Sequence, residues 1–438
     1  RHKARLVAHD QGGAVATRAR IAIQNLRSRA NHFPRSLWLL AFANFVLFTA
    51  RGMTIPFLVI YFGQVIGLGV GLVGAGIAAS SIVGVAFTLV AAGTIDRFGA
   101  RSMLIVTIAG TGITTAFFPI STTRILFFAI MILQGLFSQL YWPSSDALAT
   151  SLVPMSQAGE MFAMLRVANA LGIGAGGLIG GLIVAGGTES EYRILYLAAA
   201  TGILIAGVLV VILIRPAKRT VTTANAGDAT SVGSWGDVLR DRRFMFSQIV
   251  MFILLAAFTQ LQVSAPPYLK AQAGIDEAWI GLLFTINTLI VVVAQLWMAR
   301  KVARWGRGFT LAFAAIFWAV SYVMIGASPW LTFLPFVAIV VYTVGEMMFM
   351  PTSGVIVVEL APERLRGRYL AFSSVIWGTA WGLSSWASGA TLGSAHPVLL
   401  WPALIVVLAI GAVGGILFDR QDSVPLLSTQ RIGVADSD

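Results

Sequence analysis

Apolar runs of about twenty residues recur along almost the whole chain and alternate with short clusters of Gly, Pro and charged residues. A helix of about 20 residues crosses the roughly 30 Å of hydrocarbon in a bilayer. Because lipid offers backbone groups no water to bond, such unbroken runs indicate spanning helices. The pattern predicts an all-α membrane protein with twelve transmembrane helices, at 36–61, 68–93, 102–121, 125–147, 163–186, 194–214, 244–267, 278–299, 309–328, 330–354, 369–391 and 398–418.

Basic residues distinguish the two sides of this predicted fold. The odd-numbered gaps between spans carry only Arg124, Arg193 and Lys270. The other gaps carry many more: Arg97, Arg101, Arg215, Lys218, Arg219, Arg240, Arg242, Arg243, Arg300, Lys301, Arg304, Arg307, Arg364, Arg366 and Arg368. Cytoplasmic loops are enriched in Lys and Arg, so we expect these gaps and both termini in the cytoplasm of a multi-pass protein of the bacterial inner membrane.

A polar connection divides the predicted spans six and six. Residues 220–231 are small and polar, which is typical of a flexible linker. The predicted organisation is a basic cytoplasmic N-terminal tail (1–35), an N-terminal six-helix bundle (36–214), a cytoplasmic linker (215–243), a C-terminal six-helix bundle (244–418) and a cytoplasmic C-terminal tail (419–438). The N-terminal tail is either a surface helix on anionic lipid, a disordered segment or an upstream extension of the true start.

The two predicted bundles share the same spacing of Pro, Gly and small residues. Pro and Gly positions in the fourth span and its following loop recur 208 residues later, as do small residues in the fifth span. The matching positions are Pro143, Ser145, Pro154 and Gly159 with Pro351, Ser353, Pro362 and Gly367. Transporters are often built from repeated bundles around a central site, so we expect the bundles to be pseudo-symmetric.

Composition limits the chemistry available to the chain. It is 57% hydrophobic and 11% charged, and it has no cysteine, so thiolate nucleophiles and Cys-ligated metals are excluded. All four histidines lie outside the predicted spans. The formal charge of +12 comes from basic residues spread over the gaps, which membrane topology explains better than nucleic-acid binding. We therefore expect no cofactor, no metal and no nucleic-acid partner.

The loop after the second span carries the clearest family signal. Gly93-Thr-Ile-Asp96-Arg97-Phe-Gly99-Ala-Arg101 resembles the signature loop of the major facilitator superfamily, with Ala100 at a usual arginine position. The resemblance extends over essentially the whole chain after the N-terminal tail. It implies a cytoplasmic gate in which the aspartate faces the start of the eleventh helix and an arginine reaches a fourth-helix acid. The implied gate residues are Gly93, Asp96, Arg97, Gly99, Arg101 and Asp146.

The fifth span contains glycines at helical spacing. Gly172, Gly176, Gly180 and Gly181 resemble the fifth-helix motif associated with antiporters, although Gly177 stands where a proline is usual. The resemblance implies export. The alternative is a close-packed glycine face that says nothing about transport direction. In either case these glycines are predicted to contact neighbouring helices.

A few costly polar groups lie inside the predicted spans. An ionisable side chain at the bilayer centre costs about 2.5–3.5 kcal/mol, so each one is a candidate functional residue. We expect Glu346 to carry a proton because burial favours its neutral form, with Asp146 as the second candidate. Arg51 is expected to hold an anionic group or act on a nearby acid, a structural ion pair being the alternative. The expected cavity residues are Arg51, Gln134, Gln139, Gln260, Gln262, Glu346, Trp377 and Trp381.

These features favour a transporter over an enzyme. The chain has no Gly-x4-Gly-Lys-Ser/Thr phosphate loop and no predicted soluble domain, so an ion gradient is the expected energy source. The predicted function is proton-coupled efflux of amphipathic drug-like or lipid-like small molecules by alternating access, with protons and membrane lipid as the other partners. The alternatives are an uptake symporter or facilitator for a polar metabolite, and a membrane-embedded enzyme or receptor. The last lacks any compact acid–base constellation.

Overall fold

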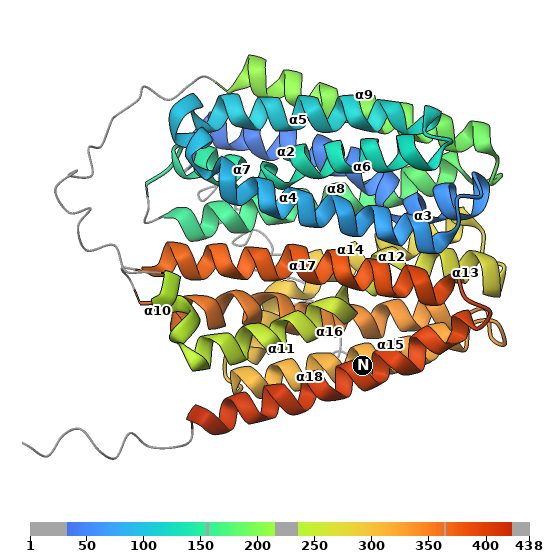
Figure 1. The fold of residues 1–438 in the computed structure, drawn as a ribbon. Helices are drawn as coiled ribbons and strands as arrows, with labels where there is room; N and C mark the ends of the chain where they lie inside the picture. Colours follow the sequence, from blue (N-terminus) through green and yellow to red (C-terminus); the bar gives the residue numbers. More distant parts are fainter. Residues whose placement is uncertain (1–32, 155–156, 215–234, 363–364, 423–438) are drawn as a thin grey trace, which may run out of the picture.

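A computed structural model describes residues 33–154, 157–214, 235–362 and 365–422, apart from the side chains of 89–96, 158–159 and 421–422. Every regular element in these ranges is a helix, so the all-α prediction is confirmed for the part of the chain described. Figure 1 shows long helices lying side by side along one direction. Most of the predicted N-terminal tail, most of the linker and most of the C-terminal tail fall outside the described residues.

The helices follow the predicted spans closely. In the first half they are α2 (Arg35–Thr54), η1 (Ile55–Phe57), α3 (Leu58–Ile60), η2 (Tyr61–Val65), α4 (Val70–Phe98), α5 (Ala100–Phe117), η3 (Phe118–Ile120), α6 (Arg124–Gln139), α7 (Tyr141–Thr150), α8 (Ala158–Ile183) and α9 (Glu189–Leu213). In the second half they are α10 (Trp235–Arg240), α11 (Arg242–Phe258), α12 (Gln260–Val263), α13 (Ala265–Ala273), α14 (Glu277–Val302), α15 (Arg307–Gly326), α16 (Leu334–Leu360), α17 (Arg366–Leu392), η7 (Pro397–Leu399) and α18 (Leu400–Asp422).

Large apolar side chains cover much of the outer surface. Ile125, Val293 and Trp330 are 86%, 82% and 75% exposed. A water-soluble protein rarely exposes apolar surface on this scale, whereas lipid solvates it. Eleven helical stretches among the described residues are long and apolar enough to cross a membrane.

The eleventh predicted span, α17, is the exception. It is 27 residues long but contains several serines and falls below the apolarity of the other spans. Figure 1 shows α17 between the two halves, where it packs along α4 and α11. Its polar groups are used inside the protein: Ser384 shares a hydrogen bond of 2.8 Å with Thr259, and Ser373 donates one of 2.8 Å to Gln248. An interior position explains the lower apolarity.

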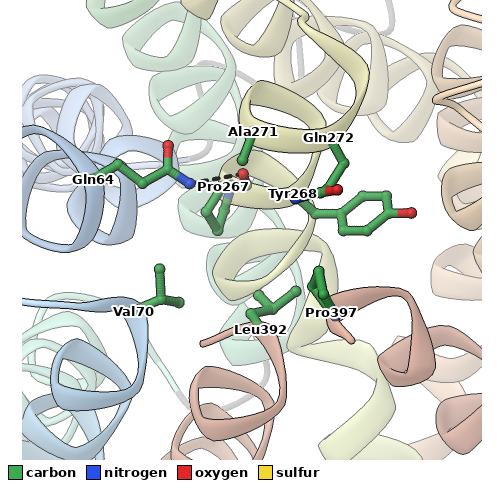
Figure 2. A pocket seen from close by; sticks show the side chains of 8 residues that line it. All are labelled: Gln64, Val70, Pro267, Tyr268, Ala271, Gln272, Leu392 and Pro397. Carbon is green, nitrogen blue, oxygen red and sulfur yellow. Dashed lines mark hydrogen bonds between the residues drawn. The ribbon is translucent and has the colours of Figure 1, made fainter. Parts of the chain in front are cut away.

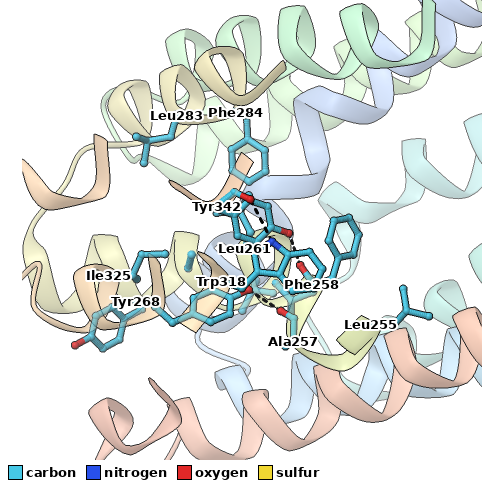
Figure 3. Packing of buried hydrophobic residues seen from close by; sticks show 14 of the residues in the cluster. Leu255, Ala257, Phe258, Leu261, Tyr268, Leu283, Phe284, Trp318, Ile325 and Tyr342 are labelled. Carbon is cyan, nitrogen blue, oxygen red and sulfur yellow. Dashed lines mark hydrogen bonds between the residues drawn. The ribbon is translucent and has the colours of Figure 1, made fainter. Parts of the chain in front are cut away.

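Three predicted spans are broken rather than continuous. The first changes from α2 through η1 to α3 and η2, the fourth breaks between α6 and α7, and the seventh divides into α11, α12 and α13. Proline lacks a backbone N–H and clashes with the preceding turn, and Pro56, Pro143 and Pro266 lie at or near these breaks. At the seventh-span break, Tyr342 donates a 2.6 Å hydrogen bond to the carbonyl oxygen of Phe258 (Figure 3).

The two halves use the same set of helix pairings. In the first half, α2 packs on α8, α5 on α9, and α4 on α6. In the second half, α11 packs on α17, α15 on α18, and α14 on α16, which are the corresponding pairs in chain order. Two further pairs, α4 with α17 and α8 with α14, join the halves along a seam. This correspondence is what an internal repeat produces.

The seam differs between the two ends of the molecule. We call the end with η2, α13 and η7 the α13 end, and the opposite end, with α10, the α10 end (Figure 1). Toward the α13 end the backbones touch: a Cβ on Gly181 would lie 2.7 Å from the carbonyl oxygen of Glu277, and one on Gly74 would lie 3.3 Å from the carbonyl carbon of Ser385. Toward the α10 end, a Cβ on Gly354 or Gly367 would meet nothing within 4 Å. The described part of the seam is therefore closed at the α13 end.

Candidate functional site

A cavity of about 90 Å³ lies between the halves, next to Glu346. The first half supplies an apolar wall from α8, and the second half supplies polar and aromatic groups from α12, α14 and α16. The lining residues are Ala170, Ile173, Leu261, Gln262, Phe284, Asn287, Thr288, Val291, Tyr342 and Glu346. Of the predicted cavity residues, Gln262 and Glu346 line this space.

Neutral groups surround the Glu346 carboxylate. Asn287 Nδ2 donates to Glu346 Oε2 at 2.8 Å and lies 2.9 Å from the hydroxyl oxygen of Thr343. No basic side chain among the described residues forms an ion pair with Glu346. A carboxylate held by one amide donor and facing a cavity can exchange a proton or meet a cationic ligand, because no fixed cation neutralises it. Asn287 is not among the cavity residues expected from the sequence.

Arg51 lies in an aromatic setting and is not among the residues that line the Glu346 cavity. Its guanidinium carbon is 4.8 Å from the ring centroid of Tyr141 and 5.5 Å from that of Phe48. Cation–π contacts of this kind stabilise a charge where no carboxylate is available. Among the described residues no acid forms an ion pair with Arg51, so the structure does not show the structural ion pair considered as an alternative.

The remaining predicted cavity glutamines contact other helices. Gln134 of α6 accepts a hydrogen bond from Thr114 and donates one of 3.5 Å to Thr115, both in α5. Gln260 is 1% exposed and donates to the carbonyl oxygen of Ala256 at 2.7 Å. Gln139 packs in the seam, where its Nε2 would lie 3.3 Å from a Cβ on Gly378. Gln134 and Gln260 therefore bond to hydroxyl groups and backbone within the helix bundle.

The two predicted cavity tryptophans are half-buried on α17. Trp377 lies with its ring centroid 6.0 Å from that of Phe258 in an edge arrangement. The carbonyl oxygen of Trp381 accepts a hydrogen bond of 2.7 Å from Ser385. Both side chains pack against the main hydrophobic core rather than appearing in the wall of the Glu346 cavity.

The predicted gate residues are placed at the α10 end. Gly99 has φ 84°, a conformation that favours glycine, and it makes the turn from α4 to α5. Arg101 donates to the carbonyl oxygens of Ile214 at 2.6 Å and Val211 at 2.7 Å. It therefore caps the C-terminus of α9, whose last carbonyls have no helical donor, instead of reaching the acid of the fourth span.

The other gate residues are only partly described. Asp146, on α7, is exposed. Arg97 is also exposed, with its guanidinium carbon 5.4 Å from the ring centroid of Phe98. The side chain of Asp96 is not among those described, and Gly93 lies in the same stretch of α4. Among the described side chains, no ion pair joins Arg97 or Arg101 to Asp146.

The predicted packing glycines of α8 lie between two helices. A Cβ on Gly172 would be 2.7 Å from the carbonyl oxygen of Phe45 in α2, and one on Gly180 would be 2.6 Å from that of Met53. Gly176 faces the same stretch of α2, with the Met53 nitrogen 2.8 Å from its Cβ position. Gly181 faces α14 across the seam. One helix thus contacts both a partner in its own half and the opposite half at backbone distance.

The chain matches a family model and several characterised proteins. The model for the Major Facilitator Superfamily matches residues 40–385 and 249–431. A Na(+), Li(+), K(+)/H(+) antiporter of Planococcus maritimus is 27% identical over 78% of this chain and 86% of its own length. The multidrug resistance protein MdtH of Klebsiella pneumoniae is 25% identical over 74% of this chain and 77% of its own length.

Solved structures share the same fold. A POT family transporter in complex with 5-aminolevulinic acid superimposes with a TM-score of 0.72 at 14% identity, covering 89% of this chain and 96% of that one. A mutant of the nucleoside transporter NupG gives 0.70 at 14% identity, covering 87% and 99%. With the repeated helix pairings and the cavity between the halves, these matches show that the chain is a multi-pass membrane transporter of the Major Facilitator Superfamily.

Proposed function

We propose that this protein is a proton-coupled exporter of amphipathic drug-like or lipid-like small molecules that works by alternating access. The observation that carries this proposal is the Glu346 carboxylate, which faces a cavity between the halves without a basic partner among the described residues. The cavity also offers apolar and aromatic walls from Ile173, Leu261 and Phe284. A site of this kind suits a molecule with both an apolar body and a polar group.

Glu346 couples the proton to the substrate by changing its charge. Deprotonated, it is an uncompensated charge next to an apolar wall and stabilises a state in which water or substrate reaches it. When Glu346 is protonated, the free-energy cost of burying its charge is gone, so the two halves can close over it. A proton and a substrate that favour different states of the carrier then exchange across the membrane.

The orientation and domain organisation follow from charge. The arginine-rich gaps lie at the α10 end, which we assign to the cytoplasm of a bacterial inner membrane. The bundles 36–214 and 244–418 rock about the seam, and Asp96, Arg97 and Asp146 form the cytoplasmic gate when that end closes. The similarity to an antiporter and to a multidrug resistance protein supports export over uptake.

Exchange of a monovalent cation for protons is the second candidate. The antiporter of Planococcus maritimus named above supports it, as does the oxygen-rich side of the cavity. Glu346, Asn287, Gln262 and Thr288 supply one carboxylate and three neutral oxygens, the ligand type that hard cations prefer. A single carboxylate would balance one monovalent charge.

Reconstitution in liposomes tests both candidates. With an acidic lumen and the membrane potential held at zero, an exporter accumulates the permanently charged dye ethidium inside as protons leave, whereas a symporter does not. Glu346→Gln should lower this rate at least tenfold, and Glu189→Gln, which changes an exposed carboxylate at the start of α9, should not. Full proton-driven accumulation by Glu346→Gln would refute the carrier assignment.

The same vesicles separate the two substrate classes. External Na⁺ or K⁺ that alkalinises the acidic lumen in a Glu346-dependent way, with no movement of ethidium, would replace the first candidate by cation exchange. A pH-sensitive dye trapped in the lumen provides the readout. Ethidium transport without any response to Na⁺ or K⁺ is the result expected of the first candidate.

A further inference from the structure

Three side chains form a polar cluster across the seam at the α13 end. Tyr192 of α9 belongs to the first half, and Lys270 of α13 and Glu277 of α14 belong to the second. The Tyr192 hydroxyl donates to Glu277 Oε1 at 2.9 Å, and the Lys270 ammonium forms an ion pair with the same oxygen. Lys270 Nζ also lies 5.7 Å from the centroid of the Tyr192 ring. We call these three residues the α13-end clamp.

Two of the three clamp residues, Tyr192 and Glu277, are buried, and Lys270 is half-buried. The Glu277 side chain is 4% exposed and that of Lys270 is 26% exposed. Gly187, in the α8–α9 connection, has φ 67°, and a Cβ there would approach Glu277 Oε1 to 3.2 Å and Lys270 Nζ to 3.4 Å. A carboxylate removed from water needs both its countercharge and its hydrogen-bond donor, so the first half supplies part of what keeps Glu277 stable.

A second hydrogen bond crosses the seam nearby and ends on the same segment of the second half. Gln64 Nε2 of η2 donates to the carbonyl oxygen of Pro267 in α13 at 2.9 Å, beside a small surface cavity (Figure 2). The two hydrogen bonds between the halves, from Tyr192 and from Gln64, therefore end on the first turn of α14 and on α13. The breaks at Thr259 and Ser264 separate this segment from α11, so it is held to the first half by side chains while its own helix is interrupted.

We propose that Tyr192, Lys270 and Glu277 are positioning residues that keep the two halves together at the α13 end, and that this clamp opens each time the central cavity opens toward that end. No sequence motif identified them: Glu277 lies at a predicted span boundary, and Lys270 counted only as a loop charge. The proposal concerns the position of the halves and holds for any transported solute. Loss of a contact made in only one state shifts the equilibrium toward the other state.

The absence of native cysteine allows a direct test. Ser385 of α17 is 0% exposed, packs by Gly74 of α4 in the closed part of the seam, and differs from cysteine by one atom. Ser385→Cys in lipid nanodiscs, where both faces are accessible, should react slowly with a polar maleimide. Adding Tyr192→Phe should raise that rate about tenfold, since a hydrogen bond to a charged group is lost in the closed state only. Tyr196→Phe is the matched control, because its buried hydroxyl has no hydrogen-bond partner among the described residues.

A second variant removes both charges of the clamp, so that neither is left buried without its partner. Lys270→Met combined with Glu277→Met removes both charges and keeps side chains of similar length, so we expect the variant to fold. It should also speed labelling of the reporter about tenfold. Equal labelling of the Tyr192→Phe and Tyr196→Phe proteins, or a parental rate in the folded double methionine variant, would overturn the proposal. Because labelling is measured without substrate, its outcome does not depend on the transport assays that test the proposed function.

Discussion

Glu346 and Gln134 are both polar residues inside predicted spans, but their side chains have different surroundings. The cost of ionisable groups in lipid identified Glu346, and the structure places it on a cavity between the halves. The same reasoning grouped Gln134 with it, yet Gln134 bonds to α5. Depth along a helix can be predicted from span position, but the rotation of the helix about its axis depends on packing. Partners such as Asn287 and Glu346, 59 residues apart, become visible only when α14 and α16 are in place.

Arg101 offers a prediction at the residue scale. Arg101→Ala removes two charged donors from the carbonyls at the end of α9, and should lower the free energy of unfolding by about 1–3 kcal/mol. Arg193→Ala serves as the comparison, because its ion pair with Glu189 is an exposed pair one helical turn apart that water screens, so it contributes little. Thermal unfolding in detergent measures both. Equal small shifts would show that Arg101 does not act as a cap.

At the scale of elements, apolar run length predicted the helices well, and their interruptions less well. The breaks in the first, fourth and seventh spans occur at or near prolines that the sequence displays. Whether a proline breaks a helix depends on its neighbours: α16 continues through Pro351. The position of α17 between the halves likewise comes from tertiary packing.

The glycines of α8 allow a prediction for an element. Gly176→Ala places a methyl group against the α2 backbone, where the Met53 nitrogen would be 2.8 Å away, so α2 and α8 must separate. We expect loss of folded protein on size-exclusion chromatography. Gly354→Ala is the opposite case, because its Cβ would meet nothing within 4 Å and alanine favours a helix by about 1 kcal/mol. Similar behaviour of the two variants would contradict close packing of α8 on α2.

At the scale of the molecule, the repeat in the sequence corresponds to a repeat in helix pairing. Proline and glycine spacing indicated two similar halves, and each half pairs its helices in the same order. The closed state of the seam at the α13 end could not be predicted. Alternating access requires one sequence to support more than one arrangement, so the sequence pattern alone does not favour a particular state.

Orientation in the membrane is a prediction for the whole molecule. A single cysteine at Glu189, at the start of α9, should react with an impermeant maleimide added to intact cells, since the proposed topology places the α13 end outside. A single cysteine at Arg304, between α14 and α15, should react only after the membrane is opened. The parent chain supplies a blank because it contains no thiol. The reverse pattern would invert the proposed topology.

The modest apolarity of α17 also bears on how the protein is made. Ser373 and Ser384 of α17 bond to Gln248 and Thr259 of the seventh span, so α17 gains little by entering lipid alone during synthesis. The more apolar α18 follows it after a short connection, so the two are expected to leave the translocon as a helical hairpin. Chains that end before α18 would then hold α17 at the membrane surface, exposed to quality-control proteases.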